Sequence, residues 1–318
     1  MKKILKKIDV IEKYYLHYIL LIISFLLYLL TRHVIFAVLG GSSILLIVGM
    51  DIVKGTIKKG MKNEIKEIVI AIVLALSIWF GLVFLLGTSI PINAIVSCSM
   101  LPDYERGDLI ILKGEQEINA PSIYVENIND INNTAIIEIE GNTYGLNGSI
   151  FVYCLDKNTD FCTDFKIYPE KYYEMHGPLK FNYGTCKREY QDKSNINTIC
   201  VKNIEFKEKI YELNKTNDIM VYEPKKEDLF ALTGDIIHRV YLKINSPQGE
   251  YYLIKGDNNA IFDLQMHSST YQRGNSLVSK QQSKGIVILR IPYVGYAKLF
   301  LFGMWVEPQG CESFIVEY

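Results

Sequence analysis

Three long apolar stretches lie near the amino terminus, and they constrain the fold of this chain more than any other feature. They cover residues 14–31, 34–50 and 68–90, and none of them contains a Lys, Arg, Asp or Glu. An α-helix of about 20 apolar residues crosses the hydrocarbon core of a bilayer. We therefore predict three transmembrane helices and a membrane anchor over residues 1–91. A re-entrant pair is the alternative for the middle stretch, because the run of Gly and Ser at 40–43 lowers its hydropathy.

Lysine residues indicate how these helices are oriented. They gather at the amino terminus and in residues 51–67, which we expect to form a loop, whereas the turn at Arg32 and His33 carries little charge. The positive-inside rule then makes the amino terminus cytoplasmic. We expect a multi-pass protein of the cell membrane whose residues 92–318 are extracytoplasmic. The formal net charge of −1 argues against nucleic acid as a partner.

After Asn93 the helical periodicity ends, and short β-branched runs separated by turn residues follow. This pattern is typical of antiparallel sheet. We expect strands at 109–112, 135–138, 150–152, 219–222, 236–243, 251–254 and 285–291. The predicted fold class is therefore membrane-anchored and mainly β, with three N-terminal transmembrane helices followed by an antiparallel β domain.

Four cysteines, Cys154, Cys162, Cys186 and Cys200, lie in the polar segment 114–216, which is rich in Asn and Tyr. This segment has little apolar periodicity from which to build a core. In an oxidising compartment, two disulfides among these cysteines would offset that deficit. Three pairings are possible, and the sequence does not choose between them. No Cys-x-x-Cys pair occurs among the four, so we favour disulfides over zinc and predict no metal site.

A serine, a histidine and two aspartates occur in an order that suggests hydrolytic chemistry. Ser99 follows the last apolar stretch closely, His238 lies in the run Ile-Ile-His-Arg-Val, and Asp257 and Asp263 come after it. A serine hydroxyl is a poor nucleophile unless a base lies within hydrogen-bond reach and a third group orients that base. These residue types meet the requirement, and they predict a serine hydrolase at a membrane surface.

Four ordered runs carry a family resemblance: Ser-Cys-Ser-Met-Leu-Pro at 97–102, Arg-Gly-Asp-Leu-Ile-Ile-Leu at 106–112, Ile-Ile-His-Arg-Val at 236–240, and Lys-Gly-Asp-Asn-Asn at 255–259. With Asp263 beyond them, they resemble the boxes of type I signal peptidases of the archaeal and endoplasmic-reticulum type. That branch carries histidine where the ordinary bacterial enzymes carry a lysine base. The resemblance covers residues 95–113 and 217–303, so it implies a catalytic domain over 92–318 with residues 114–216 as a disulfide-rich insertion.

The resemblance assigns a role to each matching residue. It makes Ser99 the nucleophile and His238 the general base. Asp263 matches the carboxylate that orients the histidine, and Asp257 matches a second required carboxylate. Ser97 stands where the family places a hydroxyl of the oxyanion hole, which must point to where negative charge develops.

One residue departs from the family pattern, and other residues offer alternatives. Cys98 replaces the usual glycine between the two serines, so we expect a thiol beside the active site, and a Cys98 nucleophile is an alternative to Ser99. His267 is a rival base near the motifs. Asp235 follows a glycine and is interpreted as a turn residue. The apolar residues at 300–305 are too few to span a bilayer, so they rest on the membrane or join the core.

The implied function is a membrane-bound signal peptidase I, a serine endopeptidase that cleaves preprotein signal peptides after small residues without a cofactor. Its partners would be signal peptides and membrane lipid, with the translocation channel or accessory subunits as further candidates. Two alternatives remain: a dedicated processing peptidase for a few surface proteins, and a non-catalytic membrane-anchored binding protein that keeps the peptidase fold.

Overall fold

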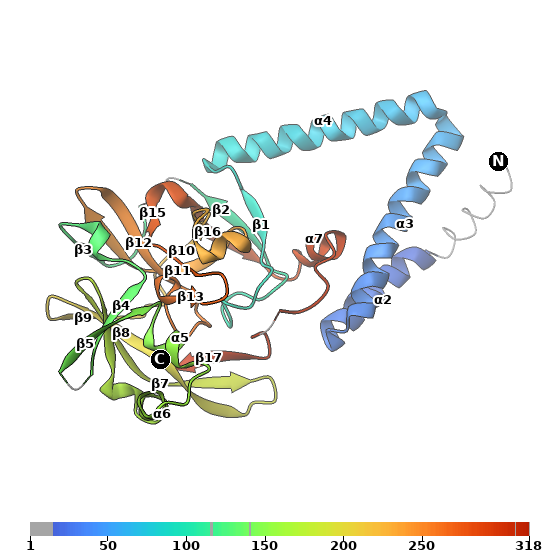
Figure 1. Cartoon of the computed structure of the whole chain (residues 1–318). Coiled ribbons are helices and arrows are strands. Elements are labelled where there is room, and N and C mark those ends of the chain that lie inside the picture. Colours follow the sequence, from blue (N-terminus) through green and yellow to red (C-terminus); the bar gives the residue numbers. More distant parts are fainter. Residues whose placement is uncertain (1–14, 115–116, 140, 309, 318) are drawn as a thin grey trace.

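The computed structural model describes residues 15–114, 117–139, 141–308 and 310–317. Within these ranges the chain forms an arm of apolar helices and a body of β-strands (Figure 1). Residue 14, where the first predicted helix begins, lies outside the described residues. The predicted mainly antiparallel β fold with apolar helices at its amino-terminal side is confirmed.

The arm consists of α2 (Leu16–Thr31), α3 (Val34–Lys59) and α4 (Met61–Leu86). The helices α2 and α3 lie side by side, and α4 leads from the far end of α3 to the body (Figure 1). By length and composition, α3 and α4 are each able to cross a membrane, with 26 residues apiece. The helix α2 is apolar but shorter, with 16 residues.

Residues 51–67 do not form the loop that we predicted from their lysines. The helix α3 continues to Lys59, and α4 begins at Met61. The chain turns at Gly60, whose φ of 83° suits a residue without a side chain. Charged residues are compatible with helix, so lysine content locates the end of an apolar stretch but does not locate the end of a helix.

The middle apolar stretch is a continuous helix, and two of its three glycines, Gly40 and Gly41, allow close packing. A Cβ atom at Gly40 would lie 3.3 Å from the Phe300 ring, and one at Gly41 would lie 3.3 Å from the Phe300 carbonyl oxygen. Phe300 belongs to α7 (Tyr296–Leu301) and is 3% exposed in a core that also contains Tyr28 of α2. Thus Phe300 joins the core, whereas Leu301 and Phe302 remain exposed.

The first sheet carries the matched motifs. Its strands lie in the order β1-β2-β16-β10-β11-β12-β15, all neighbours being antiparallel, with β3 added in parallel to β11. The bounds are β1 (Ile92–Ala94), β2 (Leu109–Lys113), β3 (Ser122–Tyr124), β10 (Ile219–Tyr222), β11 (Ile236–Ser246), β12 (Gly249–Lys255), β15 (Val278–Ser279) and β16 (Ser283–Ile291).

The second sheet comes mostly from the segment that the family motifs do not cover. Its order is β5-β4-β6-β7-β8-β9, and β17 from the end of the chain pairs with β7. The bounds are β4 (Thr134–Ile139), β5 (Asn142–Asn147), β6 (Tyr173–His176), β7 (Leu179–Tyr190), β8 (Asn195–Phe206), β9 (Lys209–Glu212) and β17 (Ser313–Glu317). A separate pair joins β13 (His267–Ser268) to β14 (Arg273–Gly274).

Short helices complete the body: α5 (Ile150–Cys154), α6 (Asp160–Ile167), and the 3-10 turns η1 (Ile128–Asp130), η2 (Pro169–Lys171), η3 (Leu229–Leu232), η4 (Asp263–Gln265) and η5 (Lys280–Gln282). The strand predicted at 150–152 is therefore wrong. Ser149 caps α5 by accepting the Val152 N–H at 3.1 Å, and this cap favours helix over strand for the same apolar residues.

The segment 114–216 does build a core, contrary to our expectation from its composition. Phe165, Phe181 and Ile204 are all at most 1% exposed, and they cluster with Leu242 of β11 and Leu253 of β12. The second sheet thus shares its core with the first. Disulfides join Cys154 to Cys162 and Cys186 to Cys200, which selects one of the three possible pairings.

Candidate active site

The candidate nucleophile Ser99 lies in the irregular segment that follows β1. Its neighbours Cys98 and Met100 are buried, whereas Ser99 itself is partly exposed. The backbone carbonyl of Ser99 accepts the Asn258 N–H at 2.7 Å. The turn after β12 therefore holds the backbone of Ser99, and this contact does not involve the serine hydroxyl.

The structure brings Ser99, His238 and Asp263 together in one chain of hydrogen bonds. His238 lies on β11 in the interior of the first sheet, and its Nε2 is 3.0 Å from the Ser99 hydroxyl. Its Nδ1 is 2.7 Å from Asp263 Oδ2. Since a carboxylate only accepts, Nδ1 carries the proton and Nε2 remains an acceptor for the serine hydroxyl. This is the geometry that a serine nucleophile requires.

Tyr222 of β10 adds a contact that the sequence analysis missed. Its hydroxyl donates to the same Asp263 oxygen at 2.8 Å. Burial raises the pKa of Tyr222 well above its usual value, and the Asp263 charge raises it further, so the hydroxyl keeps its proton. The tyrosine therefore helps to fix the carboxylate beside His238.

Asp257 does not join this chain of hydrogen bonds. It is 1% exposed and accepts two hydrogen bonds from the Arg239 guanidinium, from Nε at 2.9 Å and from the terminal nitrogen at 2.6 Å. The same terminal nitrogen also donates to Asp103 at 3.0 Å. Burial alone would lower the pKa of Arg239, but the hydrogen bond and the charge of Asp257 raise it. Arg239 thus connects Asp257 to Asp103, which lies in the segment after Ser99.

Ser97 is exposed, and its hydroxyl oxygen lies 3.3 Å from that of Ser99. Both serines and His238 line a groove, together with residues 93–96 and 235–237. Asp235 is thus a lining residue of this groove, and it comes just before β11. The strand β1 is at one end of the first sheet, so the groove runs beside a sheet edge.

Gly256 is the second residue that the sequence analysis missed. A Cβ atom there would lie 2.7 Å from the Ser99 carbonyl oxygen and 2.8 Å from His238 Nε2. The turn after β12 therefore approaches the serine and the histidine too closely for any side chain. Beside it, burial lowers the pKa of Lys255 to about 7, and its ammonium nitrogen bonds the Asn259 carbonyl at 2.8 Å.

The expected thiol beside Ser99 is contradicted. Cys98 forms a disulfide with Cys311, and the described part of the chain contains no free cysteine. A disulfide sulfur carries no thiolate, so the Cys98 nucleophile is excluded in this state. The rival base His267 lies in the small β13–β14 pair, where it is opposite Gly274.

Comparisons with known proteins agree with these motifs. The chain is 33% identical over 84 residues to the signal peptidase complex catalytic subunit SEC11 of Verticillium alfalfae, which is 26% of this chain and 44% of that protein. It is 32% identical over 92 residues to SEC11 of Sclerotinia sclerotiorum, covering 29% and 48%. An uncharacterized protein of Methanocaldococcus jannaschii is 28% identical over 219 residues, covering 67% and 85%.

The chain spans about half the length of the SEC11 relatives that it matches. No family model matches the chain. The similarity to SEC11 nevertheless bears out the resemblance found in the sequence: over the matched residues the chain is similar to signal peptidase complex catalytic subunits.

Proposed function

We propose that this protein is a membrane-bound signal peptidase I, a serine endopeptidase that cleaves signal peptides from exported preproteins after small residues. The observation that carries the proposal is the hydrogen-bonded chain from Ser99 through His238 to Asp263. Ser99 and His238 line a groove beside a sheet edge, and extended peptides are commonly bound along such edges. The names of the SEC11 relatives support the same conclusion.

In the proposed reaction, the Ser99 oxygen attacks the scissile carbonyl carbon while His238 Nε2 takes the serine proton. The tetrahedral intermediate then collapses, and His238 gives that proton to the leaving amine. Water attacks the resulting acyl-enzyme while His238 takes its proton, and His238 then returns that proton to the Ser99 oxygen as the bond to the acyl group breaks and the acid product leaves. The Ser97 hydroxyl and the Ser99 backbone N–H are the proposed donors to the oxyanion, and loss of one such donor costs roughly 3–4 kcal/mol.

The two aspartates have different proposed roles. Asp263, with Tyr222 beside it, holds His238 in the tautomer that accepts from the serine and stabilises the imidazolium that forms. Asp257 pairs with Arg239, which also bonds Asp103 in the segment after Ser99. Asp257 is therefore proposed to position the nucleophile segment and to take no part in proton transfer.

For location, we propose that residues 1–91 anchor the protein with three spans, the amino terminus being cytoplasmic. Residues 92–318 then form the extracytoplasmic catalytic domain, with residues 114–216 inserted in it. The three disulfides are consistent with an oxidising compartment. Signal peptides and membrane lipid are the proposed partners, together with the translocation channel or accessory subunits.

The test is cleavage of several preproteins and of a short soluble peptide by the purified full chain. Ser99→Ala should abolish cleavage of every substrate, whereas Ser246→Ala, the same change at an exposed hairpin end, should leave it intact. Cleavage of a few surface proteins alone would favour a dedicated processing peptidase. A folded wild-type chain that cleaves nothing would favour the non-catalytic alternative.

A further inference from the structure

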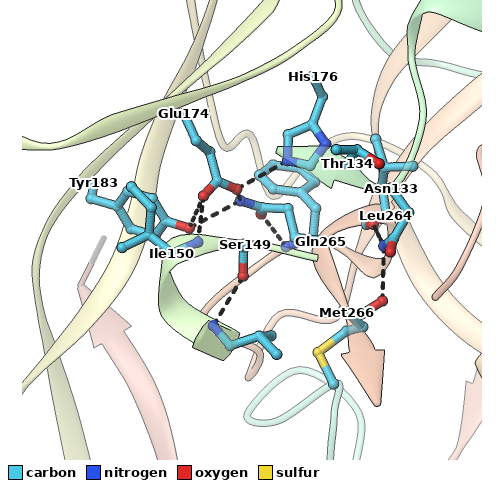
Figure 2. Close-up of polar contacts among 12 residues, drawn as sticks. Asn133, Thr134, Ser149, Ile150, Glu174, His176, Tyr183, Leu264, Gln265 and Met266 are labelled. Atoms are coloured by element: carbon cyan, nitrogen blue, oxygen red, sulfur yellow. Dashed lines mark hydrogen bonds and ion pairs between the residues drawn. The ribbon is translucent and has the colours of Figure 1, made fainter. Parts of the chain in front are cut away.

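A buried polar cluster lies outside the candidate active site, in the second sheet (Figure 2). Its centre is Glu174 of β6, which is 0% exposed. One carboxylate oxygen accepts the Ile150 N–H at 2.7 Å and the Tyr183 hydroxyl at 3.0 Å. The other faces His176 Nε2 at 3.0 Å and accepts from Gln265 Nε2 at 2.5 Å. Four polar groups thus converge on one carboxylate, which a residue buried at this depth requires.

The cluster has a defined hydrogen-bond direction. His176 Nδ1 lies 2.8 Å from the Asn132 carbonyl oxygen, so Nδ1 carries a proton. Its Nε2 and the Glu174 oxygen then need one further proton between them. Gln265 presents its NH₂ group to Glu174 because its carbonyl oxygen accepts the Phe262 N–H at 2.8 Å. The Gln265 amide therefore cannot exchange its donor and acceptor positions without losing one of these hydrogen bonds.

Gln265 connects this cluster to the candidate active site. It closes the turn η4, whose first residue is Asp263. Asn133, which immediately precedes β4, bonds the carbonyl oxygens of Leu264 and Met266 in and after the same turn (Figure 2). The turn that carries Asp263 is therefore held by residues of the segment 114–216.

Asp263 depends on that turn for its position. Its Oδ2 bonds His238 and Tyr222, but its Oδ1 is buried and has no hydrogen-bond partner among the described residues. Both hydrogen bonds end on the same oxygen, so they hold that oxygen but not the orientation of the whole carboxylate, which also depends on the backbone of η4. A misplacement of about 1 Å commonly costs an enzyme about a hundredfold in rate.

We propose that Glu174 and Gln265 are positioning residues that hold Asp263 against His238, so that the segment 114–216 supports bond cleavage as well as any partner or substrate choice. This inference rests on the proposed function. It concerns residues that touch neither the Ser99 hydroxyl nor the groove, and it acts entirely through the η4 turn.

The first variant is Glu174→Gln, which keeps the shape of the side chain and replaces one accepting carboxylate oxygen by an NH₂ group. The new amide nitrogen would point at the NH₂ group of Gln265, so two donors would meet. If the Gln265 amide rotated to avoid this, its own NH₂ group would point at the Phe262 N–H instead. One buried donor is left unpaired in either case. We expect kcat for a short peptide to fall roughly tenfold to a hundredfold, with KM nearly unchanged.

The second variant is the exchange Glu174→Gln with Gln265→Glu. The amide at 174 then donates to the carboxylate at 265 and to His176 Nε2, while the carboxylate at 265 still accepts the Phe262 N–H. We expect this double variant to recover most of the lost kcat. If Glu174→Gln alone fails to fold, the double variant still tests the inference, because it should be folded and active.

Thr159→Ala is the matched control. Thr159 caps α6 in the same segment by accepting the Cys162 N–H at 3.2 Å, and this bond is outside the hydrogen bonds that join Glu174 to η4. This variant should lower Tm with kcat of the folded protein unchanged. Equal kcat losses in Thr159→Ala and Glu174→Gln, or a folded Glu174→Gln with wild-type kcat, would overturn the proposal.

A second readout separates this inference from the proposed function. The proton between His238 Nδ1 and Asp263 should give a low-field NMR resonance that is absent from His238→Gln. Glu174→Gln should shift or broaden this resonance, and the double variant should restore it. An unchanged resonance sinks the positioning role, whereas a wild-type chain that cleaves no peptide sinks the proposed function and leaves the resonance test standing.

Discussion

Gly256→Ala is the change that tests the candidate active site most directly. The added methyl would lie 2.7 Å from the Ser99 carbonyl oxygen, 2.8 Å from His238 Nε2 and 2.8 Å from Asn259 Nδ2. Ordinary van der Waals contact begins at 3.4 Å, so these groups must separate by about 0.6 Å. The Ser99 carbonyl is fixed by the Asn258 N–H, so the methyl should push the imidazole out of line.

The expected loss follows from that displacement. His238 Nε2 and the Ser99 hydroxyl are 3.0 Å apart, and a shift of the imidazole breaks the path of the proton. We expect kcat to fall about a hundredfold, which corresponds to roughly 3 kcal/mol of transition-state stabilisation. Overpacking should also destabilise the fold by about 1–3 kcal/mol.

The assay is steady-state cleavage of a short peptide with small residues before the scissile bond, combined with thermal unfolding. Gly145→Ala is the control, because a Cβ atom there meets only Thr134 and Ile136, at 3.6 Å and 3.9 Å. It should keep wild-type kcat. A folded Gly256→Ala whose kcat stays within about threefold of wild type would refute the proposed geometry.

Three further predictions address the base, a buried lysine and a disulfide. His238→Lys should be inactive in the peptide assay, because its single nitrogen cannot stand at the positions of both imidazole nitrogens, which bond Ser99 and Asp263 separately; near-normal turnover would instead favour a lysine-type geometry. The pKa of Lys255 is lowered to about 7, so above that pH the unfolded chain binds more protons than the folded one. Stability should therefore rise with pH between about 7 and 10, and Lys255→Met should flatten this rise in urea unfolding. Cys311→Ser should destabilise the protein by about 2–5 kcal/mol in denaturant, yet the folded variant should still cleave; complete inactivation would give the disulfide a part in catalysis.

The sequence predicts the first sheet better than the second because the two sheets differ in pattern. The strand at 219–222 is a short β-branched run between turn residues, and the structure has β10 with the same bounds. In the second sheet, β8 (Asn195–Phe206) begins with three exposed residues and then mixes half-buried and buried ones without clean alternation. An apolar run between turn residues or a strict alternation identifies a strand, and β8 has neither pattern.

The residue types of the site could be predicted, but its contacts could not. Tyr222 lies within an apolar run, and its contact with Asp263 depends on how β10 pairs with β11, which no local pattern encodes. The bond between Cys98 and Cys311 spans 213 residues, so spacing gave no sign of it. The even total of six cysteines was the available signal, because four paired cysteines leave two more to account for.

The turn after β12 contains Gly256, Asp257 and Asn258, and their different contacts explain why three different residue types stand there. Gly256 leaves room for Ser99 and His238, and Asp257 bonds the Arg239 guanidinium. Asn258 donates its N–H to the Ser99 carbonyl and its side-chain amide to Ser313 of β17 at 2.9 Å. Three successive residues therefore contact the nucleophile segment, Arg239 and β17. Because each contact needs a different property, namely no side chain, a negative charge and an amide, no one residue type could replace another along this turn.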